Sequence, residues 1–126
     1  MNETDIVEVL IGLPRSSNIA GTKSISSLLT ESGYCDYHDR ISELLIASAL
    51  SQKPELINEW LAYSEDKRTS SGWYIKQDKS NAFIVGDLTA GGRVIEFHDK
   101  INACAAFIKQ EVETIRKGLT ITNLKS

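Results

Sequence analysis

The stretch that decides the fold is WYIKQDKSNAFIVGDL, residues 73–88, in which apolar and polar side chains begin to alternate. In an extended chain Trp73 and Ile75 point to one side, whereas Tyr74 and Lys76 point to the other. The run AFIVGDL carries apolar residues on both sides, and a third run, RVIEFH, alternates again after the turn-forming LTAGG. The pattern predicts a three-stranded antiparallel meander with its most buried strand in the middle, over about 72–77, 82–88 and 93–98.

A long amphipathic helix is expected directly after the third strand, over about 99–117. Asp99 is a good N-cap, and apolar residues then recur at helical spacing. Lys109, Glu113 and Lys117 fall on the opposite side of this helix, which predicts that they face solvent. The apolar stripe needs a sheet face to cover, so the helix is expected to pack on the meander. The stripe consists of Ile101, Cys104, Ala105, Ile108, Val112 and Ile115.

The first half of the chain is predicted to be helical, although its first segment is ambiguous. The apolar residues between Ile6 and Ile11 fit a short helix or a strand equally well. The segment from Gly12 to Gly21 has the composition of a loop, since it is rich in glycine, proline and serine. Three helices are predicted after it, over about 24–32, 36–50 and 54–66.

The last two of these N-terminal helices are expected to pack as an antiparallel pair, because few residues separate them. Asp36 can cap the first of the two, and Pro54 lies in the first turn of the second. Together with the meander and the last helix they give an α+β fold, and a chain of this length is expected to be a single domain over 1–126. The predicted buried stripes are Ile41, Leu44, Leu45 and Ala49 in the first helix, and Leu56, Ile57, Trp60 and Leu61 in the second.

The composition is that of an ordinary globular protein, with 41% hydrophobic and 25% charged residues. The first residues are acidic, and no apolar run is long enough to span a bilayer. These features favour the cytoplasm and predict no membrane partner. In that reducing compartment Cys35 and Cys104 are expected to be free thiols, with Cys104 a small core residue of the last helix.

Charge is distributed unevenly along the chain, whose formal net charge is −3. Residues 1–63 contain nine acidic and four basic side chains, a balance of −5, whereas residues 64–126 contain eight acidic and ten basic ones, a balance of +2. An acidic half repels the phosphates of nucleic acid and suits a basic protein partner.

No motif in the chain specifies catalysis, a cofactor or a metal. Cys35 and His38 supply a C-x-x-H pair, but a structural zinc site needs four ligands. The enzymatic alternatives are a thiolate–imidazole pair of Cys35 and His38, or His38 and His98 as acid and base for RNA cleavage. The run GTKS at 21–24 lacks the glycine spacing of a phosphate-binding loop. We therefore expect no enzyme activity, no cofactor, no small-molecule substrate and no nucleic-acid ligand.

The order of features in the second half resembles that of small immunity proteins from bacterial polymorphic-toxin and contact-dependent growth-inhibition systems. Many of these proteins carry a Gly-Trp-aromatic strand, a short hairpin and a helix of the form F-x-D…A-C-A-x-F-I-x-x-E. The resemblance covers about a third of the chain. The matching positions are Gly72, Trp73, Tyr74, Phe97, Asp99, Ala103, Cys104, Ala105, Phe107, Ile108 and Glu111.

The resemblance implies a non-enzymatic protein that binds one cognate toxin domain in the cytoplasm and blocks its active site or an essential surface. Such toxins are often nucleases, whose basic clefts suit an acidic inhibitor. A generic adaptor or regulatory subunit that binds another protein is the alternative, and a small hydrolase or RNase is a third hypothesis. The predicted partner-binding residues are Asp36, Asp39, Glu43, Glu55, Glu59, Glu65 and Asp66, with Tyr34, Tyr37 and Tyr63 as aromatic anchors.

Overall fold

The computed structural model describes residues 3–20, 25–67, 73–79, 82–87 and 94–125, and side chains within these ranges except at 17–20, 25–26, 66–67 and 119–125. The turn expected at LTAGG, which contains Gly91 and Gly92, lies outside the described residues. The elements in chain order are α1 (Glu3–Ile11), α2 (Leu13–Ala20), α3 (Ile25–Ser32), α4 (Tyr34–Tyr37), η1 (His38–Arg40), α5 (Glu43–Gln52), α6 (Leu56–Lys67), β1 (Trp73–Gln77), β2 (Phe83–Asp87), β3 (Val94–Phe97) and α7 (Lys100–Lys125).

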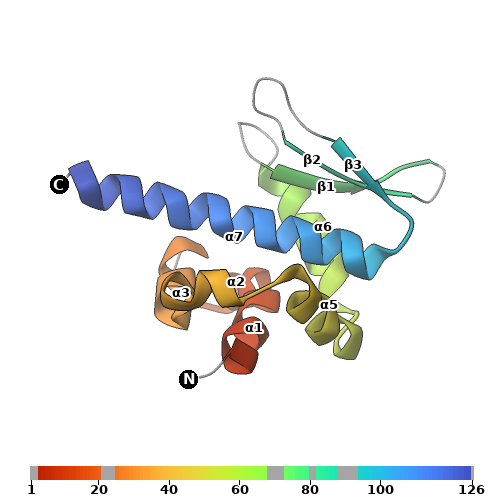
Figure 1. Ribbon diagram of the computed structural model, residues 1–126. Coiled ribbons are helices and arrows are strands. Elements are labelled where there is room, and N and C mark those ends of the chain that lie inside the picture. Colours follow the sequence, from red (N-terminus) through yellow and green to blue (C-terminus); the bar gives the residue numbers. More distant parts are fainter. Residues whose placement is uncertain (1–2, 21–24, 68–72, 80–81, 88–93, 126) are drawn as a thin grey trace.

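The long helix α7 crosses the molecule between two layers (Figure 1). On one side it packs against all three strands of the sheet, and on the other it packs against α3 and α5. Helix α6 lies beside α7 and packs against β1 as well as α2. This arrangement confirms the α+β prediction, with the last helix packed on the sheet.

The sheet has the predicted antiparallel order β1-β2-β3. Ile75 pairs with Val85, and Val85 pairs with Ile95, so these three residues share one face. Ile75 and Val85 are buried in the core under α6 and α7, and β2 is the most buried strand, as predicted. The outer edge of β1 is covered, because Ser64 Oγ of α6 accepts a hydrogen bond from the backbone N–H of Ile75 at 2.8 Å.

The opposite sheet face points away from the helices and is organised around Tyr74. Tyr74 pairs directly with Gly86 on β2, and its ring lies over that glycine. The ammonium of Lys76 lies 5.9 Å from the centre of the same ring. Trp73 is half-buried against the core, so the two aromatic residues have separate roles in packing.

Gly86→Ala is expected to lower the free energy of unfolding by about 1–2 kcal/mol. An added Cβ would lie 2.5 Å from Cζ of Tyr74, so the ring would have to leave the sheet surface. Urea unfolding of the variant checks the loss. The same substitution in a Tyr74→Ala background should cost less, and an equal cost in both backgrounds would contradict the steric explanation.

The N-terminal half departs from prediction in its boundaries. The ambiguous first segment is helical. The predicted loop is wrong over residues 13–20, since Leu13 and Pro14 are buried and begin α2, while Gly21 lies outside the described residues. The helix predicted over 36–50 is broken into α4, η1 and α5. Gly33, with φ of 84°, starts the first piece, and Ser42 caps α5 in place of Asp36 by accepting the N–H of Leu45 at 3.2 Å.

The buried face of α5 is also different from the predicted stripe. Ile46, Ala47 and Leu50 face the core, whereas Leu44 and Leu45 are 77% and 40% exposed. The predicted antiparallel pairing of α5 with α6 is wrong as well. Helix α5 packs mainly against α7 and α1, and α6 packs mainly against β1, α2 and α7.

The C-terminal helix follows its prediction closely and extends further. Asp99 Oδ1 accepts the N–H of Ile101 at 3.0 Å, which confirms the N-cap. The helix continues to Lys125 rather than ending near residue 117. Cys104 is buried as predicted, and that burial raises the pKa of its thiol to about 12. Residues 103–108 are all buried, because this part of α7 has a packed layer on either side.

Candidate protein-binding surface

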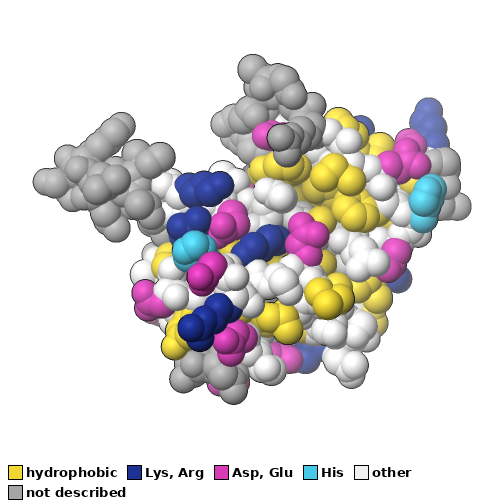
Figure 2. All heavy atoms as spheres, in the orientation of Figure 1, with side chains coloured by type: hydrophobic (Ala, Val, Ile, Leu, Met, Phe, Trp, Pro, Cys, Tyr) yellow, Lys and Arg dark blue, Asp and Glu magenta, His cyan; other side chains and the backbone are white. Residues whose placement is uncertain are grey.

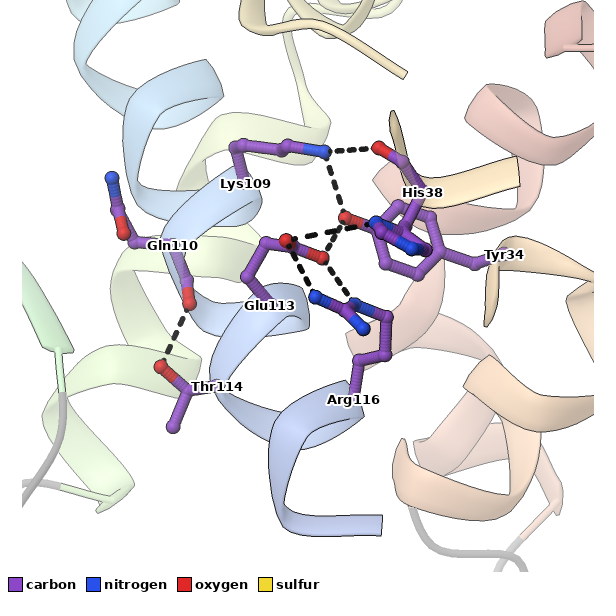
Figure 3. Close-up of polar contacts among 7 residues, drawn as sticks. All are labelled: Tyr34, His38, Lys109, Gln110, Glu113, Thr114 and Arg116. Carbon is purple, nitrogen blue, oxygen red and sulfur yellow. Dashed lines mark hydrogen bonds and ion pairs between the residues drawn. The ribbon is translucent and has the colours of Figure 1, made fainter. Parts of the chain in front are cut away.

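A network of polar side chains joins α4 and η1 to the middle of α7 (Figure 3). Tyr34 donates its hydroxyl hydrogen to Glu113 Oε2 at 2.6 Å. Lys109 Nζ donates to Tyr34 Oη at 2.9 Å and to the backbone carbonyl of His38 at 2.7 Å. Arg116 holds both oxygens of Glu113, at 2.8 and 3.1 Å. We call these five residues, Tyr34, His38, Lys109, Glu113 and Arg116, the α4–α7 cluster.

The α4–α7 cluster keeps one carboxylate ionised and one phenol neutral. Burial raises the pKa of Tyr34, and its hydrogen bond to Glu113 adds to the rise. Burial opposes ionisation of Glu113, but hydrogen bonds from Arg116 and Tyr34 and the charge of Lys109 lower its pKa to about 2. Burial lowers the pKa of Lys109 and outweighs the attraction of Glu113. The hydrogen bonds of Lys109 and Tyr34 link α7 to α4 and η1, so the cluster anchors these two short elements on α7.

The anchored segment presents acidic and apolar side chains side by side along the chain. Asp36, Asp39 and Glu43 are exposed, and both Asp39 and Glu43 lie close enough to Lys109 to act on its pKa. Figure 2 shows hydrophobic, acidic and basic side chains interleaved over α5 and the adjoining part of α7. We define the α4–α5 surface as Asp36, Tyr37, Asp39, Glu43, Leu44 and Leu45.

Two acidic residues of the predicted partner-binding set, Glu59 and Glu55, interact with Arg15. Glu59 is half-buried and accepts two hydrogen bonds from Arg15, with Nε at 3.1 Å from Oε1. Glu55 lies near the same arginine and helps to raise its pKa, after the larger effect of Glu59. Glu65 is exposed on α6, while the side chain of Asp66 lies outside the described residues. Among the members of the acidic set whose side chains the structure describes, Asp36, Asp39 and Glu43 lie on α4, η1 and α5 and are exposed.

The three tyrosines differ in what they can offer a partner. Tyr34 is fully buried, so the prediction that it anchors a partner is wrong. It lies beneath the α4–α5 surface rather than on it. Tyr63 is half-buried and donates its hydroxyl hydrogen to the buried Glu111. Tyr37 is half-buried, and the guanidinium of Arg40 lies 5.8 Å from its ring centre. Only Tyr37 therefore belongs to the surface.

The α4–α7 cluster was not predicted from the sequence, which placed Lys109 and Glu113 on a solvent-facing side of the last helix. The spacing of Lys109, Glu113 and Arg116, at i, i+4 and i+7, does place the three on one helix face. What the sequence lacks is any sign that Tyr34, 79 positions before Glu113, lies opposite that face.

The two histidines considered as an acid–base pair lie far apart. Figure 2 shows the two histidine side chains widely separated, so they do not form an acid–base pair. His98 is exposed, with Nε2 at 3.8 Å from Glu96 Oε1, while His38 Nδ1 lies 4.0 Å from Glu113 Oε1. Within the part of the chain that the structure describes, no three His, Cys, Asp or Glu side chains are grouped so that they could hold a metal ion.

Comparisons of the chain with protein-family models, with curated proteins and with solved structures give no significant match. Over the described ranges, none of the helices combines the length and the apolar character that crossing a membrane requires. The α+β architecture and the α4–α5 surface are therefore the structural basis for a functional proposal.

Proposed function

We propose that this chain is an immunity protein. It binds a cognate toxin domain in the cytoplasm, for which a nuclease is the expected class, and blocks the active site or an essential surface of that toxin. The observation that carries the proposal is the α4–α5 surface, where three exposed carboxylates and two exposed leucines occur close together in the chain. The resemblance of the β1 and α7 segments to small immunity proteins supports the same class.

The acidic side chains suit a partner that itself binds a polyanion. A nuclease presents lysines and arginines to the phosphates of its substrate, so its cleft attracts carboxylates. Complementary charge of this kind accelerates association and makes the rate sensitive to salt. The α4–α7 cluster contributes by holding α4 and η1 on α7 before binding, which reduces the entropy lost when the complex forms.

Reversing three charges, as Asp36→Lys, Asp39→Lys and Glu43→Lys together, is expected to lower the association rate constant by about tenfold or more at low ionic strength. The gap to wild type should narrow as salt is added, because screening weakens long-range attraction. Stopped-flow association with the toxin domain of an adjacent gene product, once such a gene is identified, measures both effects.

The matched control is a variant with the same change in net charge placed elsewhere, Asp5→Lys with Glu31→Lys and Glu96→Lys. These three residues are exposed and lie on α1, α3 and β3. The control should change the association rate much less. Equal slowing by both variants would assign the effect to net charge alone, and no slowing by the first variant would reject the acidic surface.

Two simpler observations test the class itself. A gene for a secreted toxin directly upstream, together with protection of cells that express that toxin, supports immunity. Protection that survives combined Cys35→Ala, His38→Ala and His98→Ala substitution excludes the hydrolase and RNase hypotheses.

A further inference from the structure

Two rows of side chains cross the outer face of the sheet, which lies opposite α6 and α7 (Figure 1). In one row Lys76 on β1 pairs with Ile84 on β2, and Ile84 pairs with Glu96 on β3. Paired residues on neighbouring strands point to the same face and lie beside each other, so the strand register places these three side chains. The row therefore has a positive end, an apolar centre and a negative end, and both charged side chains are exposed.

The second row carries no charge. Tyr74 pairs with Gly86, and Gly86 pairs with Val94, which is 62% exposed. Because Gly86 has no side chain, the ring of Tyr74 lies over it. The solvent face of an antiparallel sheet is usually polar, whereas Tyr74, Ile84 and Val94 give this face an apolar area that a partner can cover.

The order of charges along the first row selects a second copy of this chain as the partner. A two-fold axis that runs parallel to β2 above Ile84 places β1 of one copy over β3 of the other. Lys76 of each copy then faces Glu96 of the other, and the two Ile84 side chains meet at the axis. Tyr74 of one copy faces Val94 of the other in the same arrangement. An axis at right angles to the strands would instead bring Lys76 against Lys76, so the charges favour one arrangement.

The other charged groups described near this face leave it neutral. Asp78 and Lys79 follow β1 and carry opposite charges. His98 Nε2 lies 3.8 Å from Glu96 Oε1 and competes for that carboxylate only when it is protonated. Since the charges of Lys76 and Glu96 also balance, the face has no net charge that would attract nucleic acid or a strongly basic protein.

We propose that the protein forms a weak two-fold dimer through the outer face of its sheet, with Lys76–Glu96 ion pairs on both sides and Ile84 at the centre. One face of a three-stranded sheet is small for a protein interface, so the dissociation constant is expected to be on the order of 100 µM. The protein is then monomeric at the low micromolar concentrations used for unfolding and rate measurements. Helix α5 lies across α7 from the sheet (Figure 1), so this inference does not depend on the proposed function.

Sedimentation velocity over a concentration series from about 10 µM to about 1 mM, at about pH 8, tests the dimer. Lys76→Glu and Glu96→Lys should each weaken it at least about tenfold at low ionic strength, because each variant creates two pairs of like charges. An equimolar mixture of the two variants should associate about as strongly as wild type, since every ion pair in the mixed dimer again joins opposite charges. The double variant, which exchanges the two charges, should recover association for the same reason.

Lys100→Glu is the matched control, because it makes the same change in net charge as Lys76→Glu at an exposed residue of α7. It should leave the dissociation constant within about twofold of wild type. A monomer throughout the concentration series overturns the inference, and so does a dimer that the single variants do not weaken or that their mixture does not restore. Thermal unfolding of each variant at low concentration should stay close to wild type, because every substituted side chain is exposed.

Discussion

Trp60→Ala is expected to lower the free energy of unfolding by about 3–5 kcal/mol and the melting temperature by about 10–20 °C. Trp60 is fully buried, and its ring makes edge contacts with Tyr63 at 5.3 Å and Phe107 at 5.9 Å between ring centres. Its indole N–H donates to the carbonyl of Ile11 at 2.9 Å. One side chain therefore joins α1, α6 and α7, and its removal leaves a cavity between them.

Two further variants separate packing from hydrogen bonding at Trp60. Trp60→Phe keeps most of the ring but leaves the Ile11 carbonyl without its donor, so it should cost about 1–3 kcal/mol. Trp73→Ala removes the same side chain from a half-buried position and should cost less than Trp60→Ala. Urea unfolding measures all three, and equal losses for the two alanine variants would contradict the central place of Trp60 in the core.

Acid is expected to remove roughly 1–2 kcal/mol of stability through Glu113 alone, because solvent screens a group that is only partly buried. The pKa of Glu113 is lowered from 4.5 to about 2 in the folded protein, through its hydrogen bonds and the neighbouring positive charges. Between these two pH values the unfolded chain binds more protons than the folded one, so stability falls as pH falls. The contribution is fully present above about pH 4.5 and is lost as the pH approaches 2.

Glu113→Gln tests this assignment. The variant should be less stable than wild type at pH 7, because Arg116 and Lys109 lose their shared counter-charge. The difference should shrink as the pH is lowered from 4.5 toward 2, and urea unfolding at a series of pH values measures it. Glu96→Gln, at an exposed residue of β3, is the control and should leave the pH profile unchanged. A constant difference at all pH values would show that Glu113 is not the titrating group.

The fold was largely predictable because its decisive half is local. Alternation in WYIKQ and AFIVGD specifies strands and their faces, and the stripe from Ile101 to Val112 specifies a helix that needs a sheet to cover. Pro14 was taken to indicate a loop, but proline is also favoured in the first turn of a helix, which is where it lies in α2.

The candidate site was predicted only in part. Asp36, Asp39 and Glu43 could be selected as an acidic group, because they lie within eight residues of one another. The sequence did not predict that Leu44 and Leu45 are exposed. The spacing of apolar residues predicts which side of a helix is buried, but it does not predict the residue at which the helix begins. Ser42 starts α5 later than predicted, and the buried face becomes that of Ile46, Ala47 and Leu50.

The sequence by itself determined the α+β class, the antiparallel meander, the helix that covers it and the acidic balance of the first half. Only the tertiary structure decided that Tyr34 meets Lys109 and Glu113, and therefore that α4 is fixed to α7. Local patterns record which side of an element is apolar. They do not record which distant element lies opposite a polar side. Helix α7 has a packed layer on either side, so its polar face, which was predicted to contact solvent, instead contacts α4.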